Sequence, residues 1–120
     1  MDKLGRDELF YKIVDLDEVN AIRMIDSIKN INYQDVNGYS YLHAAVQSGS
    51  IRIVQELINN GAEINIKDKF GKTPLMVAIA GYADDVSIIN LLLDNGADKS
   101  MKANSGVSCM NLAEMKGLSL

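Results

Sequence analysis

The sequence is poor in residues that cross-link a chain or separate domains. Its 120 residues include one proline and one cysteine, Cys109. A lone thiol cannot form an internal disulfide, so the fold needs no oxidising compartment and we expect a cytoplasmic protein. The chain also lacks a Ser/Gly-rich stretch that would act as a linker. We therefore expect residues 1–120 to form a single domain.

Membrane-directing segments are also missing. No uninterrupted apolar run approaches the ~20 residues of a membrane-spanning helix. Five of the first ten residues are charged, unlike the apolar core of a signal peptide. The net charge of -4 argues against sequence-independent nucleic-acid binding, which depends on lysine and arginine. The same acidic balance favours a basic partner, and we expect neither a nucleic-acid nor a membrane partner.

Motifs for catalysis or cofactor binding are absent from the sequence. His43 is the only histidine, and one histidine with one cysteine cannot supply the usual ligands of a zinc site. The glycines do not form the GxGxxG or GxxxxGK patterns of phosphate-binding loops. We predict no catalytic residues, no metal and no cofactor.

Internal repetition is the strongest feature that is present. Segments that begin at Asp35 and Asp68 match each other with an offset of 33 residues. The matching pairs are Gly38 and Gly71, Leu42 and Leu75, and Ala45 and Ala78. Farther along the offset grows to 35, so two extra residues lie near Tyr82–Asp85. The period indicates stacked units, which we place at residues 2–34, 35–67 and 68–102, with a half unit at 103–117.

Each unit carries the signals of two short helices. Thr73-Pro74 is typical of a helix start, because the hydroxyl caps a free N–H and proline has none to satisfy. Equivalent caps are Asp7, Ser40 and Ser108. The second helices show the apolar stripe of a buried face, at Ala21/Met24/Ile25, Val54/Leu57/Ile58 and Ile89/Leu92/Leu93. We predict an all-α solenoid of helix-turn-helix units joined by hairpin-like loops.

Two segments carry the most regular form of the repeat. They read Thr73-Pro74-Leu75-Met76-Val77-Ala78 and Ser40-Tyr41-Leu42-His43-Ala44-Ala45. These segments resemble ankyrin repeats, whose signature is T-P-L-H-x-A, and the resemblance extends from about Asp2 to Gly117 as three full repeats and a C-terminal half repeat. It implies that His43 orders the loops through backbone hydrogen bonds. It also implies a chain that binds another protein and is not an enzyme.

The ends of the chain depart from the family pattern. Ile28 stands where the family has glycine, and Lys12 lies in an alanine column. Such an atypical first unit fits a cap that exposes one face to water. Leu9, Leu118 and Leu120 are apolar residues at the two ends that could pair, so a structural or oligomerising protein is one alternative, although we expect a monomer when unbound.

The resemblance implies a partner site on the hairpin tips and on the exposed, concave side of the first helices. Tyr39, Phe70 and Tyr82 are aromatic residues that the repeat itself does not require, and aromatic residues are common interface anchors. Folding of Phe70 back onto its own hairpin is the alternative. The complete candidate set is Val36, Asn37, Tyr39, Gln47, Ser48, Lys69, Phe70, Lys72, Tyr82 and Asn104.

Charged residues gather at two places in the repeat. Lysines lie in or beside the loops between units, at Lys67, Lys69, Lys72, Lys99 and Lys102. Carboxylates lie in the turns between helices, at Asp15, Asp17, Glu18, Asp84 and Asp85. We expect a basic edge and an acidic edge, one of which steers a charged partner.

The carboxylates and the cysteine each have two interpretations. Carboxylates can hold a cation or transfer protons, which would make the chain a cryptic enzyme or metal-binding protein. They can also simply stabilise the positive end of the next helix. Cys109 is either a reactive thiol at a helix start or a small, half-buried residue.

The size and charge of the chain suggest what its binding would achieve. We expect a short, acidic, single-domain chain of this family to inhibit its partner or to act as an adaptor or scaffold. One concrete form of this hypothesis is a bacterial immunity protein that neutralises a co-expressed toxin.

Overall fold

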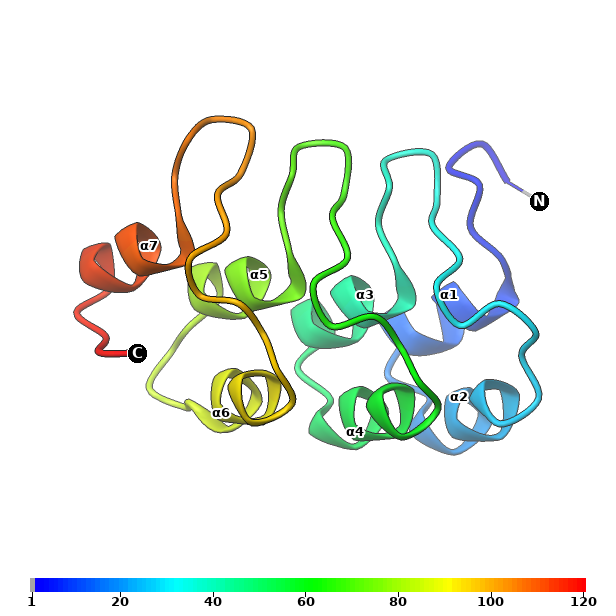
Figure 1. The fold of residues 1–120 in the computed structure, drawn as a ribbon. Coiled ribbons are helices and arrows are strands. Elements are labelled where there is room, and N and C mark those ends of the chain that lie inside the picture. Colours follow the sequence, from blue (N-terminus) through cyan, green and yellow to red (C-terminus); the bar gives the residue numbers. More distant parts are fainter. Residues whose placement is uncertain (1) are drawn as a thin grey trace.

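The computed structural model describes residues 2–120. In this range the chain forms seven α-helices, which alternate between two rows (Figure 1). They are α1 (Glu8–Val14), α2 (Glu18–Ile25), α3 (Tyr41–Ser48), α4 (Ile51–Asn59), α5 (Pro74–Ala80), α6 (Ser87–Asp94) and α7 (Cys109–Met115). Each helix packs on the next one in its own row, so the predicted all-α solenoid is confirmed. None of these seven helices has the length and apolar character needed to cross a membrane.

The helices of the odd-numbered row all begin with the same kind of cap. The side chains of Asp7, Ser40, Thr73 and Ser108 each accept a hydrogen bond from the backbone N–H three residues later. Pro74 follows Thr73 as the first residue of α5, where its missing N–H leaves nothing unsatisfied. Loss of such a cap typically costs about 1 kcal/mol. The four caps predicted from the sequence are confirmed, and they determine where each loop ends and its helix starts.

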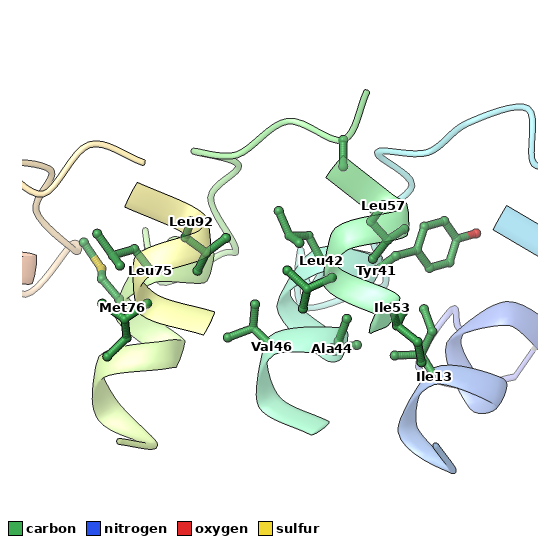
Figure 2. Packing of buried hydrophobic residues seen from close by; sticks show 14 of the residues in the cluster. Ile13, Tyr41, Leu42, Ala44, Val46, Ile53, Leu57, Leu75, Met76 and Leu92 are labelled. Carbon is green, nitrogen blue, oxygen red and sulfur yellow. The ribbon is translucent and has the colours of Figure 1, made fainter. Parts of the chain in front are cut away.

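Apolar side chains fill the space between the two rows (Figure 2). Leu42 of α3, Leu57 of α4 and Leu75 of α5 are at most 1% exposed. In each predicted stripe two residues are buried, namely Ala21 and Ile25, Val54 and Leu57, and Ile89 and Leu92. The third residue of each stripe packs half-buried against them. Each fully buried aliphatic side chain contributes about 1.5–3 kcal/mol, so this shared core holds neighbouring units together.

The N-terminal end is more closed than the sequence suggested. Leu9 is 1% exposed, so its expected role as an open apolar edge is wrong, because α1 packs on both α2 and α3. The rings of Phe10 and Tyr41 lie 4.9 Å apart, and the Tyr41 hydroxyl donates to the Asp7 carboxylate in the preceding loop. At the other end, Leu118 and Leu120 are half-buried against the core.

The turns between the two helices of a unit each contain one residue in the left-handed region. Gly49 takes this position in the second unit, with φ of 81°. Leu16 (φ 58°) and Asp84 (φ 69°) take it in the first and third units, 33 residues before and 35 residues after Gly49. The two extra residues lie in the turn from Gly81 to Val86, after which α6 begins without the side-chain cap that Asp17 gives α2 and Ser50 gives α4. Leu16 is the most strained member, because a β-carbon disfavours this conformation and leucine lacks the short polar side chain that helps Asp84 to adopt it.

Candidate binding groove

A groove of about 970 Å³ lies between the hairpin-like loops and the helices. Its floor is largely apolar and includes Val77 of α5, Ile88 of α6 and Leu112 of α7. Its wall is formed by residues of the loops around 35–39, 68–72 and 103–107. Figure 1 shows these loops standing out from the helix rows on one side of the molecule. The groove therefore spans the second, third and fourth units and reaches Arg6 of the first.

Each loop is tied to the preceding loop by one backbone hydrogen bond. These bonds run from the Val36 N–H to the Leu4 carbonyl (2.8 Å), from the Lys69 N–H to the Asn37 carbonyl (2.9 Å) and from the Asn104 N–H to the Phe70 carbonyl (2.9 Å). The three acceptors are spaced by 33 residues, so the bonds recur once per unit. The resulting ladder fixes the spacing of the loop tips and stiffens the wall of the groove.

Aspartates fix the shape of two loops from within. Asp35 Oδ1 accepts from the backbone N–H groups of Asn37 and Tyr39, at 2.8 and 2.9 Å. Asp68 Oδ1 accepts from those of Phe70 and Lys72, also at 2.8 and 2.9 Å. These local bonds hold both tips in a turn without help from a partner.

His43 joins the start of α3 to the next loop. Its Nδ1 accepts from the Ser40 N–H at 3.1 Å, and its Nε2 lies 2.8 Å from the Lys72 carbonyl. The proton therefore sits on Nε2, which donates to that carbonyl. Burial lowers the pKa of His43 and keeps the ring neutral. The ordering role implied by the family resemblance is confirmed for this residue.

Tyr39 is part of the groove wall and is held by its neighbours. Its ring stacks on His43 with centroids 4.7 Å apart, and its hydroxyl donates to Gln47 Oε1 at 2.7 Å. Burial, followed by the nearby Asp68 charge, raises the pKa of Tyr39 to about 12. The hydroxyl is therefore protonated at neutral pH and can act as a hydrogen-bond donor.

Phe70 has a different environment at the tip of the third loop. Its side chain is 54% exposed. The Lys69 and Lys72 ammonium nitrogens lie 5.2 and 5.9 Å from the centre of its ring, within the range of cation–π attraction. The ring is thus an apolar surface close to two positive charges, and more than half of the residue is open to solvent.

The ten candidate residues divide into two groups. Those that line the groove are Asn37, Tyr39, Gln47, Phe70, Lys72 and Tyr82. Val36, Ser48, Lys69 and Asn104 lie outside it. Val36 is 61% exposed at the second tip. Asn104 supports a neighbouring loop, because its Nδ2 donates to the Lys69 carbonyl at 3.0 Å.

Several residues of the groove were not anticipated from the sequence. Arg6 and Asp35 line one end and form an ion pair of 3.1 Å between the first two loops. Nothing in their 29-residue separation signals this contact. Val77 was identifiable, because it occupies the variable position of the T-P-L-H-x-A signature. Ile88 had no such signal, since apolar residues of second helices are expected in the core.

The carboxylates of the inter-helix turns make local structural contacts. Asp17 caps α2 by accepting from the Asn20 N–H, and Asp85 accepts from the Ser87 N–H and hydroxyl. Hydrogen bonds from Asn20 and Ser87 lower the pKa values of the two aspartates. Between residues 2 and 120, no three side chains of His, Cys, Asp or Glu gather in a way that could hold a metal ion. The turns themselves lie two units apart along the solenoid (Figure 1).

Cys109 is the first residue of α7 and is fully buried. Burial raises the pKa of its thiol, which outweighs the lowering effect of a hydrogen bond with Thr73. A protonated, enclosed thiol is a poor nucleophile. This environment favours the structural interpretation of Cys109 over the reactive one.

Comparisons with known proteins agree with the geometry. A family profile described as ankyrin repeats (3 copies) matches residues 11–103. An ankyrin repeat-containing protein of Schizosaccharomyces pombe is 33% identical over 98 residues, which cover 81% of this chain and 45% of that protein. An ankyrin repeat protein of fowlpox virus is 47% identical over 51 residues, covering 42% of this chain and 10% of the viral protein.

A relative with a different overall description shares the same segment. An ADP-ribosylation factor GTPase-activating protein of Arabidopsis thaliana is 36% identical over 92 residues, which cover 75% of this chain and 12% of that protein. The chain thus spans less than half the length of each of these relatives. The profile match, the signature segments and the stacked helix pairs together establish that this chain belongs to the ankyrin-repeat family.

Proposed function

We propose that residues 1–120 act as one ankyrin-repeat domain that binds a protein partner in the groove and over the loop tips. Ankyrin repeats generally mediate protein–protein interactions. The observation that carries the proposal for this chain is the rigid wall of loops beside an apolar floor. A surface that is already shaped loses little conformational entropy when a partner docks.

The groove suits a polypeptide better than a small molecule. It runs across three units and is bounded by exposed loop tips. Sites for small molecules usually enclose most of the ligand, with a few converging polar groups. Here the polar groups of the wall, Asp35 and Asp68, already accept hydrogen bonds from their own loops. What remains available is mainly apolar surface and loop-tip side chains.

We propose inhibition or scaffolding as the outcome of binding. Both follow when a domain occupies a partner's surface without changing it chemically. The toxin-neutralising immunity protein is the most specific form of this proposal, and the acidic charge of the chain is the feature that supports it. In that form, the captured partner is an enzyme whose activity falls when the two proteins are mixed.

A pair of matched variants tests the proposed groove. Ala80 lines the groove and is exposed, so Ala80→Arg places a long charged side chain in it. Asn90 is exposed on α6, so Asn90→Arg adds the same charge outside the groove. Each protein is also made with a photoreactive residue in place of Gln47 and irradiated in cells of the source organism.

We expect a cross-linked partner with the Asn90→Arg protein and its loss with Ala80→Arg, at equal melting temperatures. Mass spectrometry then identifies the partner, and mixing experiments show whether its activity is inhibited. Equal cross-linking by the two variants would contradict the proposed groove.

A further inference from the structure

Positive charge is concentrated on two neighbouring loops of an otherwise acidic chain. Lys67, Lys69, Lys72 and Lys102 are all exposed, and the carboxylates of the same two loops are Glu63, Asp68 and Asp98. The Asp68 carboxylate already accepts from two backbone N–H groups. Across residues 2–120 the ion pairs involve Arg6, Lys12 and Arg52, so these four ammonium groups have no carboxylate of their own chain within ion-pair distance.

The same loops present an apolar anchor. Phe70 lies at the tip, more than half exposed, with Lys69 and Lys72 against its ring. A partner that covers this ring must also come close to both ammonium groups. The partner surface that fits best therefore combines an apolar side chain with carboxylates around it.

The backbone around Phe70 is fixed before any partner arrives. Its N–H donates to Asp68 Oδ1, and its carbonyl accepts from the Asn104 N–H. A β-carbon on Gly71 would lie 2.5 Å from Asn104 Oδ1, which shows how closely the two loops approach. An exposed aromatic residue on a rigid loop loses little freedom on binding, which is typical of residues that dominate an interface.

We propose that the face formed by Lys67, Lys69, Phe70, Lys72 and Lys102 binds an acidic polypeptide segment that carries an apolar residue. The apolar residue packs on Phe70, and Asp or Glu side chains on either side pair with Lys69 and Lys72. This inference rests on the proposed function and specifies the partner chemistry that the groove accepts. The net charge of -4 would by itself favour a basic partner. The inference instead follows the local positive charge of this face.

Two other ligands share part of this chemistry. A single-stranded nucleic acid would also be drawn to the lysines and would stack on Phe70. The adjacent groove favours a polypeptide, because its largely apolar floor suits side chains better than a sugar-phosphate backbone. A second copy of this chain could also present carboxylates to this face. Sedimentation distinguishes such a dimer from a complex with a peptide.

The test begins with selection of peptides from a library of random linear sequences displayed on phage, using the wild-type chain as bait. We expect the enriched peptides to contain more Asp and Glu than Lys and Arg, together with an aromatic or aliphatic residue. Dissociation constants of the synthesised peptides are then measured by calorimetry at low and at physiological ionic strength.

Variants locate the binding on this face. Phe70→Ala is expected to weaken binding about 10- to 30-fold, with Phe70→Leu intermediate. Lys69→Gln/Lys72→Gln is expected to weaken it about 3- to 10-fold and to flatten its salt dependence. The control is Lys29→Gln/Lys116→Gln, which removes the same charge from exposed positions elsewhere. Equal melting temperatures of the variants and the wild-type chain would show that the changes in affinity do not come from lost stability.

The other outcomes overturn the inference in distinguishable ways. If the enriched peptides are neutral or basic and do not bind the Ala80→Arg protein, the inference of an acidic partner is wrong. The proposed function would still stand, because the peptides would bind in the groove. Preferential binding of an oligothymidylate, weakened by the same lysine variants, would replace the peptide with nucleic acid. Sedimentation as a dimer that dissociates in Lys69→Gln/Lys72→Gln would make the occupant a second copy. If the wild-type and Ala80→Arg proteins enrich the same peptides equally, both proposals are contradicted, because binding would not involve the groove.

Discussion

His43 is the residue whose protonation most directly affects the stack. In the folded chain the neutral ring bridges Ser40 and the Lys72 carbonyl, and burial lowers its pKa below the ordinary value. The unfolded chain therefore binds the proton more readily, with a pKa of about 6.5. The stabilisation is present above that pH and is lost as the pH falls from there towards the folded pKa.

We expect the melting temperature of the wild-type chain to fall on acidification through this window. His43→Gln, which carries no titratable ring, should lack that part of the dependence. It should also be less stable at neutral pH by about 1–3 kcal/mol, because buried groups lose hydrogen bonds. Parallel pH profiles for the two proteins would show that another group is responsible.

Leu16 is a second residue with a measurable effect on stability. Its φ of 58° costs about 1–2 kcal/mol for a residue with a β-carbon, and its side chain is 50% exposed. Asparagine tolerates this region better, so Leu16→Asn should stabilise the chain by about 0.5–1 kcal/mol in urea unfolding. Val19→Asn is the control, since Val19 is 59% exposed within a helix. A loss of stability in Leu16→Asn would mean that the exposed leucine contributes packing.

At the scale of elements, the close approach of neighbouring loops is the sensitive feature. Gly71 has φ of 77°, and an added β-carbon would meet Asn104 side-chain and backbone atoms at 2.5 and 2.9 Å. Gly106 has φ of 90° with nothing within 4 Å of the same position. Gly71→Ala should therefore cost about 2–4 kcal/mol, and Gly106→Ala about 1 kcal/mol. Equal losses in chemical denaturation would show that the loops can separate without penalty.

The helices were predictable because their signals are local. Thr73-Pro74 and Ser40 start helices through contacts within three residues, and the apolar stripes need only the helical period. The choice of the loop tips as the partner site came from the resemblance to ankyrin repeats, and it stays a prediction. The Arg6–Asp35 pair and the stacking of Tyr39 on His43 were not, because both depend on how loops and helix starts fit together in space.

At the scale of the whole molecule, burial is uneven along the solenoid. α3 packs against α1, α4 and α5 and buries six consecutive residues, Tyr41–Val46. α7 packs on α5 and buries Cys109 and Ala113. In a chain whose units contact mainly their neighbours, the middle opens last. Amide hydrogen exchange should be slowest in α3 and faster in α7, and uniform exchange along the chain would contradict this nearest-neighbour behaviour.

The net charge was an incomplete guide to the partner because it is a sum over the whole chain. Five lysines lie on two adjacent loops that hold three carboxylates, whereas the other carboxylates are spread over the remaining loops, turns and helices. Screening limits each charge to its surroundings within about 8–10 Å at ordinary salt concentrations. A partner at the loop tips therefore experiences mainly the lysines. Predicting this from sequence required the positions of the loops and not only the count of charges.

The exposed ring of Phe70 also offers an optical signal. The chain contains no tryptophan, so Phe70→Trp would introduce a single indole at the tip of the third loop. In the free protein its emission should resemble that of an indole in water. When a partner covers the tip, the emission maximum should move to shorter wavelength, so docking could be followed in real time without any attached label.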